Sequence, residues 1–499
     1  MKGMLSSSGG RESYDMVVIG GGAGGLSAAS GAAQLGASVA LVEKKEALGG
    51  DCLFHGCVPS KALIEAGRLA WRAERASDFG IEIPKVNVDF PDVMEHVHNT
   101  IDTVGQHDRV DRFEEMGIDV YFGDGHFVSE REFEVGDVLL RGRKFVLATG
   151  AGPKIPPIKG LEDVDYLTNL TIFDLEQQPE RLVILGGGPI GVEMGQAFSR
   201  LGSEVVILES TDYLLRRDDH ELCAILNDTF REEGIELYLE HRAVGARERD
   251  DGTIEVPASD PEGKETFLEG DTLLVSLGRS PNLEGLGLEA AGIEYTKRGI
   301  EVDSRLRTSQ HHIYAIGDCN GGYQFTHVAE YEAGVVVSNA LYGAPMHADY
   351  SVVPWTTFCD PEMAHVGLTE EEAREKGGDD LSIYRYKLEE SDRAIIDQRT
   401  EGMVKLICSG KEIVGAHILG EAAGQLLHEF VLLMSAGRPV TDISSAIHVY
   451  PSISQAVRRA ANQYYEEHLF ESRTAHLLKK LFNLRGVGRY QKKTVNKEE

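Results

Sequence analysis

The stretch YDMVVIGGGAGGLSAASGAAQLGASVALVE, residues 14–43, reads as a strand, a glycine turn, a helix and a second strand. Gly20, Gly22 and Gly25 fit the spacing G-x-G-x-x-G at the turn. In such a turn the first glycine allows the tight bend, the second lets a pyrophosphate approach the backbone, and the third lets the helix pack on the strand. Glu43 ends the second strand, where a carboxylate can accept hydrogen bonds from ribose hydroxyls. The stretch therefore predicts a dinucleotide-binding unit.

A second unit of the same kind occupies residues 180–210, ERLVILGGGPIGVEMGQAFSRLGSEVVILES. Its three spaced glycines are Gly186, Gly188 and Gly191. Two such units predict two dinucleotides, one that donates electrons and one that relays them. Glu209 closes the second strand of this unit, and a carboxylate there favours the 2′-hydroxyl of NADH over the 2′-phosphate of NADPH. Arg216 and Arg217 follow closely and keep NADPH as the alternative.

Three shorter stretches also place glycine or polar residues at the ends of predicted strands. They are FVLATGAGPKIPPIKG, LLVSLGRSPN and IYAIGDCNGG. Their candidate cofactor-binding residues are Thr149, Gly150, Gly278, Arg279, Gly317 and Asp318. Each stretch alone is more typical of a turn than of a site. Their order along the chain carries the information.

Length and composition limit the class of protein. A chain of 499 residues is long enough for about three or four domains. The net charge of −31 argues against a nucleic-acid partner, because phosphate binding needs a basic surface. No apolar run is long enough to span a bilayer, and the start, MKGMLSSSGGRESYD, has no apolar centre of a signal peptide. We therefore expect a cytoplasmic protein.

Cys52 and Cys57 lie five positions apart in GGDCLFHGCVPSK, residues 49–61. Taken alone, the two cysteines fit a structural disulfide, half of a metal site or a working dithiol. In a cytoplasmic protein structural disulfides are rare, and paired cysteines tend to be catalytic, redox-sensing or metal-binding. The chain shows no second ligand pair at a spacing that suits zinc, so no metal site is predicted.

The order of these motifs resembles the class I pyridine nucleotide-disulfide oxidoreductases, which include dihydrolipoyl dehydrogenase, glutathione reductase and mercuric reductase. The resemblance runs from about residue 14 to about residue 465 and is nearest to the mercuric-reductase-like branch, because GGDC, SDRAI and HVYPS are in its style. It implies an α/β fold with two Rossmann-type dinucleotide-binding domains and an α+β C-terminal dimerisation domain. It also implies a homodimer that uses FAD and a nicotinamide cofactor.

The resemblance implies roles for the residues of the dithiol motif. Cys52 would exchange with substrate and Cys57 would face the flavin. Pro59 suits the first turn of the helix that follows, so Cys57 would lie at a positive helix end, which lowers the pKa of a thiol. Lys61 would be the cation beside the flavin, paired with Glu193 of the second dinucleotide unit.

The domain boundaries follow from the same comparison of motifs. We expect the following five parts: a loose N-terminal tail at 1–13, a discontinuous FAD-binding domain at 14–155 and 275–345, a nicotinamide-binding domain at 156–274, an interface domain at 350–465, and a basic amphipathic tail at 466–499. A basic amphipathic helix can lie on an anionic membrane surface, and the alternative is that the tail packs on the acidic body of the protein.

The sequence departs from the family pattern in the strip SSAIHVYPSISQAVRRAA. Disulfide-reducing members place a His directly before a Pro and a Glu four residues after that Pro. The two residues form an acid–base dyad that serves the partner's dithiol. Here Tyr450 occupies the His position and Gln455 the Glu position. His448 lies two residues upstream and is our candidate for a substitute base, the alternative being an ordinary loop histidine.

We therefore expect an enzyme that relays two electrons from NADH through FAD and the Cys52–Cys57 disulfide to a small-molecule or protein disulfide, or to another small acceptor. Mercuric or other metal-ion reduction and dihydrolipoyl dehydrogenase activity are the enzymatic alternatives. A flavin-dithiol redox sensor without fast turnover is the non-catalytic alternative.

Overall fold

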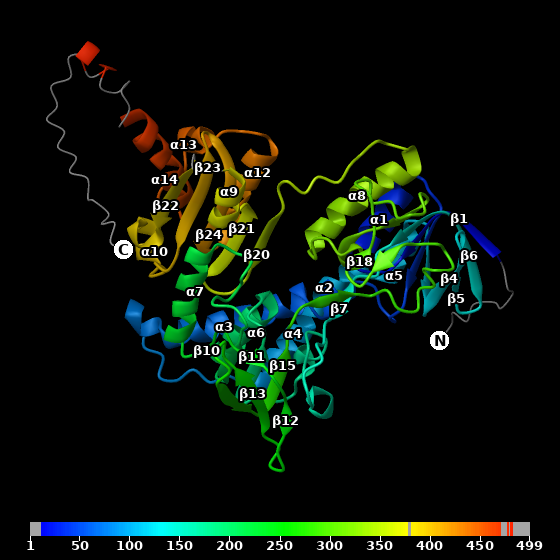
Figure 1. The fold of residues 1–499 in the computed structure, drawn as a ribbon, viewed down its shortest axis with the longest axis horizontal. Helices are drawn as coiled ribbons and strands as arrows, with labels where there is room; N and C mark the ends of the chain where they lie inside the picture. The colour runs from blue at the N-terminus through cyan, green and yellow to red at the C-terminus, as the bar shows by residue number, and fades with distance from the viewer. Residues whose placement is uncertain (1–10, 378–380, 471–476, 479, 483–499) are drawn as a thin grey trace.

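The protein is described here by a computed structural model that covers residues 11–377, 381–470, 477–478 and 480–482 (Figure 1). The predicted fold class is confirmed. Two sheets built around parallel strands each carry one glycine turn, and a third, antiparallel sheet forms the core of the C-terminal domain. Figure 1 shows the chain running from the first sheet through the second and back before it enters the C-terminal domain.

The first sheet has the order β3-β2-β1-β6-β5-β4, and β19 also pairs with β6. Its strands are β1 Arg11–Ile19, β2 Val39–Glu43, β3 Ile118–Phe122, β4 Gly125–Ser129, β5 Glu132–Val135, β6 Val138–Leu147 and β19 Ile313–Ala315. Its helices are α1 Ala23–Gln34, α2 Gly50–Phe54, α3 Cys57–Glu74, α4 Phe90–Gly105, α5 Val110–Glu115 and α8 Thr326–Tyr342. Because β19 lies far along the chain, this unit is discontinuous in sequence.

The boundary predicted for the N-terminal tail is wrong by at least three residues. We expected a loose segment up to residue 13, but β1 already begins at Arg11. Residues 11–13 pair in parallel with residues 139–141 of β6, so the ladder extends beyond the apolar stretch by which the strand was recognised. Backbone hydrogen bonds hold these polar residues in the sheet although their side chains give no strand pattern.

The second sheet has the order β10-β9-β8-β15 and is parallel throughout. It consists of β8 Arg181–Leu185, β9 Glu204–Leu208, β10 Glu236–Tyr238 and β15 Thr272–Val275, with helices α6 Pro189–Leu201 and α7 His220–Glu232. A small antiparallel sheet flanks it, formed by β11 Arg242–Ala243, β12 Arg247–Glu248, β13 Ile254–Ser259 and β14 Glu265–Gly270. The strands β8 and β9 are almost wholly buried, which explains their continuous apolar runs.

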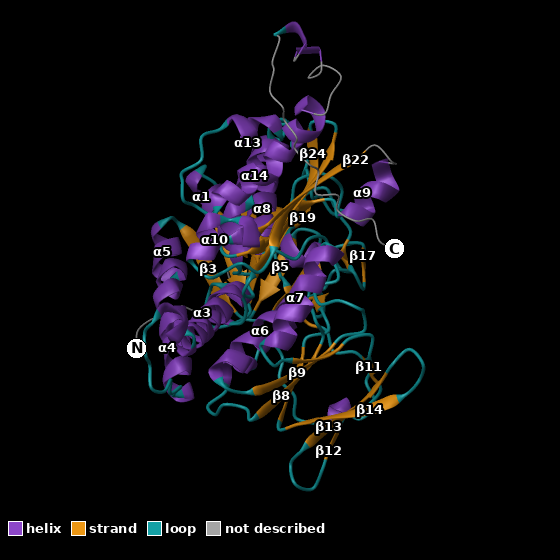
Figure 2. Ribbon diagram, turned by 90° about the vertical axis from the view of Figure 1, so that its left-hand side faces the viewer, coloured by secondary structure: helices purple, strands orange, loops and turns teal. Residues whose placement is uncertain are grey.

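The C-terminal domain is built on an antiparallel sheet of order β20-β21-β24-β23-β22. Its strands are β20 Pro354–Thr357, β21 Glu362–Gly367, β22 Leu381–Lys387, β23 Met403–Ser409 and β24 Glu412–Gly420. Its helices are α9 Glu370–Gly377, α10 Asp392–Ile396, α11 Ala423–Leu426, α12 His428–Ser435, α13 Thr441–Ser445 and α14 Ser454–Tyr465 (Figure 2). We call residues 350–465 the interface domain, as in the prediction.

Short elements complete the described chain. Two small strand pairs are formed by β7 Ala151–Pro153 with β16 Arg279–Pro281, and by β17 Tyr295–Thr296 with β18 Gly299–Ile300. Short 3-10 helices cover Ala76–Phe79, Gln106–Asp108, Leu161–Asp163, Ile172–Asp174, Gly317–Asn320 and Leu388–Glu390. A π turn at Glu466–Phe470 follows α14.

The predicted C-terminal tail lies mostly outside the described residues. Of its apolar positions, Leu477, Leu478, Leu481 and Phe482 are described, and their side chains are exposed. The membrane hypothesis and its alternative both stay predictions. Within the described residues, no helix is both long and apolar enough to cross a membrane.

Candidate active site

The two predicted dinucleotide turns have the same backbone geometry. Gly20 and Gly186 each have a φ of +111°, a conformation that residues with a side chain rarely adopt. A Cβ added at Gly20 would lie 2.2 Å from the Ala148 carbonyl oxygen, and one at Gly186 would lie 2.6 Å from the Ser276 carbonyl oxygen. The first position of each turn therefore requires glycine both for its conformation and for space.

The second glycine of each turn leaves open space at a helix start. A Cβ added at Gly188 would meet nothing within 4 Å, and one at Gly22 would approach only the Cα of Gly50, at 3.7 Å. Gly22 and Gly188 are the N-cap residues of α1 and α6, and neither helix has a side chain that caps its first turn. The backbone N–H groups at both helix starts thus face a space that fits phosphates.

The third glycine of each turn packs the helix onto its strand. A Cβ added at Gly25 would lie 1.8 Å from the Gly20 carbonyl oxygen, and one at Gly191 would lie 1.9 Å from the Gly186 carbonyl oxygen. Neither contact can be relieved by a rotamer change, because the atom that would be struck belongs to the backbone. The residues present therefore fit a bound dinucleotide at each turn in the way that the spacing predicts.

Glu43, the last residue of β2, and Glu209, which directly follows β9, each accept a hydrogen bond from a glycine turn. Glu43 accepts a hydrogen bond from the Gly21 backbone N–H at 2.6 Å, and Glu209 accepts one from the Gly187 N–H at 2.8 Å. Each carboxylate is thereby held at the edge of the turn where the ribose of a bound dinucleotide lies in this fold. The two sites are equivalent in this respect.

The dithiol motif folds into two helices with a break between its cysteines. Cys52 lies in α2, and Cys57 is the first residue of α3. Both cysteines are free thiols in this structure. The N-terminus of an α-helix carries a partial positive charge, so this position favours a thiolate at Cys57.

The surroundings of the two thiols shift their pKa values in opposite directions. A hydrogen bond from Cys52 lowers the pKa of Cys57 to about 6; a hydrogen bond with Thr326 and the charge of Lys61 act in the same direction, against the effect of burial. The hydrogen bond with Cys57, together with burial, raises the pKa of Cys52. The Cys57 Sγ lies 3.6 Å from the Thr326 Oγ1, at the start of α8. Cys57 is therefore the thiolate of the pair.

Lys61 forms the ion pair with Glu193 that the resemblance implies. Its Nζ lies 2.9 Å from the Glu193 Oε2, and Glu193 is buried on α6. The pair has a third member that sequence reasoning missed. The backbone N–H of Phe358 donates to Glu193 at 2.8 Å, and the Phe358 ring lies under the Lys61 Nζ at 4.6 Å. Because Phe358 belongs to the interface domain, this domain helps to fix the cation near the dithiol.

Asp318 lies beside the dithiol helix. The Arg279 guanidinium bridges Asp318 and Asp51, with N–O distances of 3.3 and 2.7 Å, and Asp51 directly precedes Cys52. The preceding residue, Gly317, donates its N–H to buried Glu332 at 2.6 Å, which fixes the turn. Burial raises the pKa of Asp318. Arg279 thus links α2, the helix that carries Cys52, to the turn at Asp318. Its position in the sequence did not reveal this link.

The remaining predicted cofactor residues gather near the paired strands β7 and β16. Thr149 donates its hydroxyl to the Asn282 carbonyl oxygen at 2.8 Å, and Asn282 returns a hydrogen bond to the Thr149 carbonyl oxygen. Gly150 and Gly278 have φ values of +69° and +108°.

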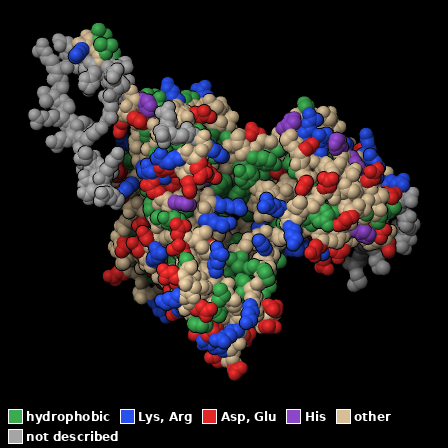
Figure 3. Space-filling view, viewed as in Figure 1, with side chains coloured by type: hydrophobic (Ala, Val, Ile, Leu, Met, Phe, Trp, Pro, Cys, Tyr) green, Lys and Arg blue, Asp and Glu red, His purple; other side chains and the backbone are tan. Residues whose placement is uncertain are grey.

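Figure 3 shows Lys and Arg side chains gathered near the middle of one face of the molecule, where its parts meet, although the whole chain is acidic.

His448 and Tyr450 lie in the interface domain and each has a partner that sequence reasoning missed. The His448 side chain is 7% exposed; its Nε2 lies 3.0 Å from a Glu429 carboxylate oxygen and its Nδ1 lies 3.2 Å from the Ala446 carbonyl oxygen. Tyr450 is 68% exposed and donates its hydroxyl to Asp392 at 3.0 Å. That hydrogen bond raises the pKa of Tyr450.

The other cysteines are buried and lie outside the dithiol motif. They are Cys223, Cys319, Cys359 and Cys408. The Cys319 thiol donates to backbone carbonyl oxygens.

His55 lies between the two active cysteines, and its Nε2 lies 3.2 Å from the Lys45 Nζ. Burial, and to a smaller extent the charge of Lys45, lowers the pKa of His55. In the described part of the chain, no group of three or more His, Cys, Asp or Glu side chains is placed to hold a metal ion.

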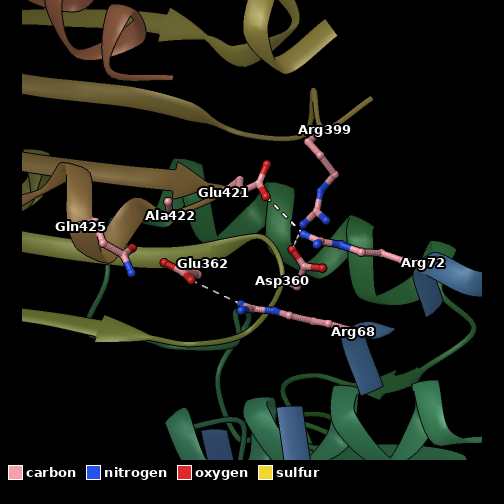
Figure 4. A pocket seen from close by; sticks show the side chains of 8 residues that line it. All are labelled: Arg68, Arg72, Asp360, Glu362, Arg399, Glu421, Ala422 and Gln425. Atoms are coloured by element: carbon pink, nitrogen blue, oxygen red, sulfur yellow. Dashed lines mark hydrogen bonds and ion pairs between the residues drawn. The ribbon is translucent and has the colours of Figure 1, made fainter. Parts of the chain in front are cut away.

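A cavity of about 150 Å³ lies where α3 meets the interface domain (Figure 4). It is lined by Arg68, Arg72, Asp360, Glu362, Arg399, Glu421, Ala422 and Gln425. Figure 4 shows the arginines reaching across to the acidic side chains: Arg68 pairs with Glu362, Arg72 with Glu421, and Arg399 with Asp360. Arg68 lies eleven residues beyond Cys57, roughly 16 Å along the helix. The Arg68 and Arg72 pairs join the dithiol helix to the interface domain, and the Arg399–Asp360 pair lies within that domain.

Comparison with known protein families gives two matches. Residues 14–333 match the family described as "Pyridine nucleotide-disulphide oxidoreductase", and residues 353–461 match its dimerisation domain. The chain belongs to the class I pyridine nucleotide-disulphide oxidoreductases. It is therefore a flavoprotein disulfide reductase of an enzyme family that uses FAD and NAD(P)H, and the dimerisation domain implies a homodimer.

Individual relatives agree with this assignment. The chain is 35% identical to a mercuric reductase of Lysinibacillus sphaericus over 90% of its own length and 82% of that protein. It is 36% identical to the dihydrolipoyl dehydrogenase of Bacillus subtilis (strain 168), over 90% and 95% of the two chains. Among solved structures, the Cu(II) complex of the HOCl-induced flavoprotein disulfide reductase RclA from Escherichia coli superposes with a TM-score of 0.81 at 28% identity, covering 91% of this chain and 99% of that one.

Proposed function

We propose that the protein passes two electrons from NADH, through FAD and the Cys52–Cys57 disulfide, to a small disulfide or another small acceptor. The observation that supports this most strongly is the environment of Cys57. It begins a helix, contacts Thr326, lies near the cation of Lys61 and has a pKa of about 6. Cys57 is stable as a thiolate in this position, and its neighbour Cys52 is the thiol that exchanges with a bound oxidant.

The electron count for a disulfide acceptor is NADH + H⁺ + RSSR giving NAD⁺ + 2 RSH. Bound FAD supplies the relay of two electrons between nicotinamide and the protein disulfide. Cys52, whose pKa is raised, is the thiol that attacks the acceptor once deprotonated; the acceptor's S–S bond breaks, a Cys52–acceptor mixed disulfide forms and the first RSH leaves. The Cys57 thiolate then attacks Cys52, so that the Cys52–Cys57 bond re-forms as the mixed disulfide breaks and the second RSH leaves. Lys61, held by Glu193 and Phe358, keeps positive charge beside Cys57.

We propose NADH as the preferred nicotinamide, with NADPH as the alternative. Glu209 is hydrogen-bonded to the Gly187 N–H and lies at the edge of the second glycine turn. A carboxylate there attracts a 2′-hydroxyl and repels a 2′-phosphate. Arg216 and Arg217 are exposed on the following segment and are the residues that would favour a phosphate.

We propose that the acceptor needs little help with proton transfer. The Tyr450 phenol, with its pKa raised by Asp392, stays protonated at neutral pH. Both ring nitrogens of His448 face oxygen acceptors, Glu429 and the Ala446 carbonyl, so neither nitrogen is turned towards a substrate. This arrangement weighs against our prediction of His448 as a substitute base. Low-pKa thiolate leaving groups, quinones and soft metal ions are the acceptors that such a site suits.

Metal-ion reduction is the second candidate. The same two observations, an exposed tyrosine at the family's His position and a His448 whose nearly covered side chain is paired with Glu429, favour an acceptor that takes electrons without taking a proton from sulfur. Relatives named mercuric reductase and a Cu(II) complex of a structural relative point to the same class. For Hg²⁺ the balance is NADH + Hg²⁺ giving NAD⁺ + H⁺ + Hg⁰, and for Cu²⁺ it is NADH + 2 Cu²⁺ giving NAD⁺ + H⁺ + 2 Cu⁺. We further propose that the protein acts as a homodimer in the cytoplasm.

An anaerobic titration of the purified, FAD-loaded dimer with NADH tests the proposed function. We expect uptake of two electrons per dithiol and a long-wavelength absorbance from the Cys57 thiolate against the flavin. The reduced protein is then mixed with a panel of acceptors: lipoamide, an activated aromatic disulfide, a quinone, Hg²⁺ and Cu²⁺.

Rapid reoxidation by the activated disulfide or quinone, with slow reoxidation by lipoamide, supports the disulfide or small-acceptor proposal. Rapid reoxidation by the metal ions alone favours the second candidate. The matched control is the Cys408→Ser variant, which removes a buried thiol outside the dithiol and should behave like the wild type. A sluggish response to NADH itself would support the redox-sensor alternative and contradict both enzymatic proposals.

A further inference from the structure

The segment that joins β9 to α7 borders the nicotinamide turn. It begins at Glu209, which accepts a hydrogen bond from the Gly187 N–H. In its middle the Leu215 N–H donates to the Gly187 carbonyl oxygen at 2.8 Å, and Leu215 adopts a φ of +55°. A non-glycine residue in this conformation is unfavourable by itself and persists only where its surroundings fix it. We call residues 209–219 the nucleotide segment.

The far end of the nucleotide segment is buried under the interface domain. Asp218 and Asp219 are 4% and 2% exposed. Asp218 accepts a hydrogen bond from the Trp355 Nε1 at 2.9 Å, and Asp219 accepts one from the Lys405 Nζ at 2.8 Å. Trp355 lies in β20 and Lys405 in β23, and Lys405 is itself 2% exposed. Two carboxylates from the nicotinamide unit are therefore inserted between side chains of another domain.

The interface domain holds Trp355 in one orientation. Its ring stacks on His365 with centroids 3.6 Å apart, and His365 packs edge-on against His417 at 4.6 Å. Both histidines donate Nε2–H to backbone carbonyl oxygens, and both Nδ1 atoms are buried without a partner, that of His365 at 4.0 Å from Asp218. Burial lowers the pKa of both histidines, so they are neutral. The indole N–H is thus the hydrogen-bond donor that Asp218 meets here.

We propose that Trp355 and Lys405 are positioning residues for the nicotinamide cofactor. By holding Asp218 and Asp219, they fix the nucleotide segment against the glycine turn, so that Glu209 and Leu215 are in place before the cofactor binds. The proposal rests on the use of NAD(P)H at this turn and is independent of the acceptor. An ordered segment raises affinity because the ordering cost is met before binding.

The expected size of the effect follows from the two anchors. Loss of one hydrogen bond at a buried site changes the balance between a docked and an undocked segment by a modest factor. The apparent affinity falls in proportion to the fraction of molecules in the docked state. Trp355→Phe keeps a smaller aromatic ring for His365 and removes the N–H donor, so we expect about a fivefold higher Kd for NAD⁺.

The test measures cofactor binding directly on the FAD-loaded dimer. Isothermal titration with NAD⁺ gives Kd, hydrogen exchange reports the backbone of residues 210–217, and steady-state kinetics separate KM for NADH from kcat. For Trp355→Phe we expect a raised Kd and KM, an unchanged kcat at saturating NADH, and faster exchange in the segment. Trp355→His retains a ring N–H and should recover part of the affinity. Asp218→Leu, which removes the acceptor, should match or exceed the effect of Trp355→Phe.

The matched control is Trp71→Phe, the same substitution at the only other tryptophan, which packs on arginines away from the segment. It should leave Kd and the exchange of residues 210–217 unchanged. An unaltered Kd in Trp355→Phe, or an equal loss in Trp71→Phe, would overturn the proposal. If the wild type bound neither NAD⁺ nor NADP⁺, the proposed function would fail, which is a different result from wild-type binding that Trp355→Phe does not change.

Discussion

Substitution of the two active cysteines should separate their roles. With a pKa of about 6, Cys57 is mostly thiolate at pH 7.5, whereas an ordinary thiol with a pKa of about 8.5 is mostly protonated there. The largest cause of the shift is the hydrogen bond from Cys52. Cys52→Ser keeps a hydroxyl donor at that position and should leave the titration midpoint near 6. Cys52→Ala removes the donor and should move the midpoint upward, because the thiolate loses its main stabilisation.

The assay is a pH titration of the long-wavelength absorbance that a thiolate gives beside oxidised FAD. Between pH 5 and 9, Cys52→Ser should gain this absorbance with a midpoint near 6, and Cys52→Ala should gain it above pH 7. Cys57→Ser should show none at any pH. All three variants should bind FAD as the wild type does, because the glycine turn at Gly20–Gly25 lies apart from the substituted side chains.

Two results would contradict these roles for Cys52 and Cys57. Equal spectra for Cys52→Ser and Cys57→Ser would show that the two thiols are interchangeable before the flavin. Equal midpoints for Cys52→Ser and Cys52→Ala would show that the Cys52 hydrogen bond does not set the pKa of Cys57. The second result would leave the Lys61 charge and the Thr326 contact as the causes, and Thr326→Val would then be expected to raise the midpoint.

Three further predictions concern other parts of the relay. Phe358→Leu removes the ring under Lys61 but keeps the backbone N–H to Glu193, so the titration midpoint of the thiolate should rise by about half a pH unit in the same assay. Glu209→Ala should raise KM for NADH and lower KM for NADPH, as measured with both nucleotides at one pH. Tyr450→His combined with a Glu at position 455 in place of Gln should raise dihydrolipoamide turnover by roughly 10²-fold, the lower end for a positioned acid–base group, and wild-type turnover as high as that of the double variant would contradict this.

Much of the fold could be predicted from the sequence because its signals are local. Gly20 and Gly186 are recognised by spacing within one strand–turn–helix unit, and the structure gives both the same φ. The start of α3 at Cys57 follows from a helical pattern with Pro59 in its first turn. The extra residues of β1 were missed because their pairing with β6, more than 120 residues away, leaves no mark in the local pattern.

The missed site residues all act across large separations in sequence. Thr326 meets Cys57 across 269 positions, Phe358 meets Glu193 across 165, and Trp355 meets Asp218 across 137. Periodicity and spacing report the neighbours within one element, whereas these contacts arise when whole domains pack together. The resemblance to a family supplied Lys61 and Glu193 as a pair, because their motifs are recognisable, but it did not supply Phe358, which contacts both.

The interface domain has two hydrogen-bonded pairs near the position of the family dyad, Tyr450 with Asp392 and His448 with Glu429. Tyr450 is exposed and can face a partner subunit, but its hydroxyl proton is directed to Asp392, and that bond makes the phenol a weaker acid. His448 is covered, and both its ring nitrogens are directed to oxygen atoms of its own domain. We therefore infer that neither group takes the proton of an incoming thiol, and that His448 with Glu429 supports the strip.

This inference separates two outcomes for His448→Ala. If His448 only supports the strip, turnover with an activated disulfide should fall modestly, with no change in the shape of its pH profile between pH 6 and 9. If His448 is the base that replaces the family histidine, the variant should lose an ionisation from the pH profile, while reduction of the flavin by NADH stays intact. Loss of that ionisation would contradict the structural reading, because it would require the Glu429 pair to open during turnover and present His448 to the dithiol.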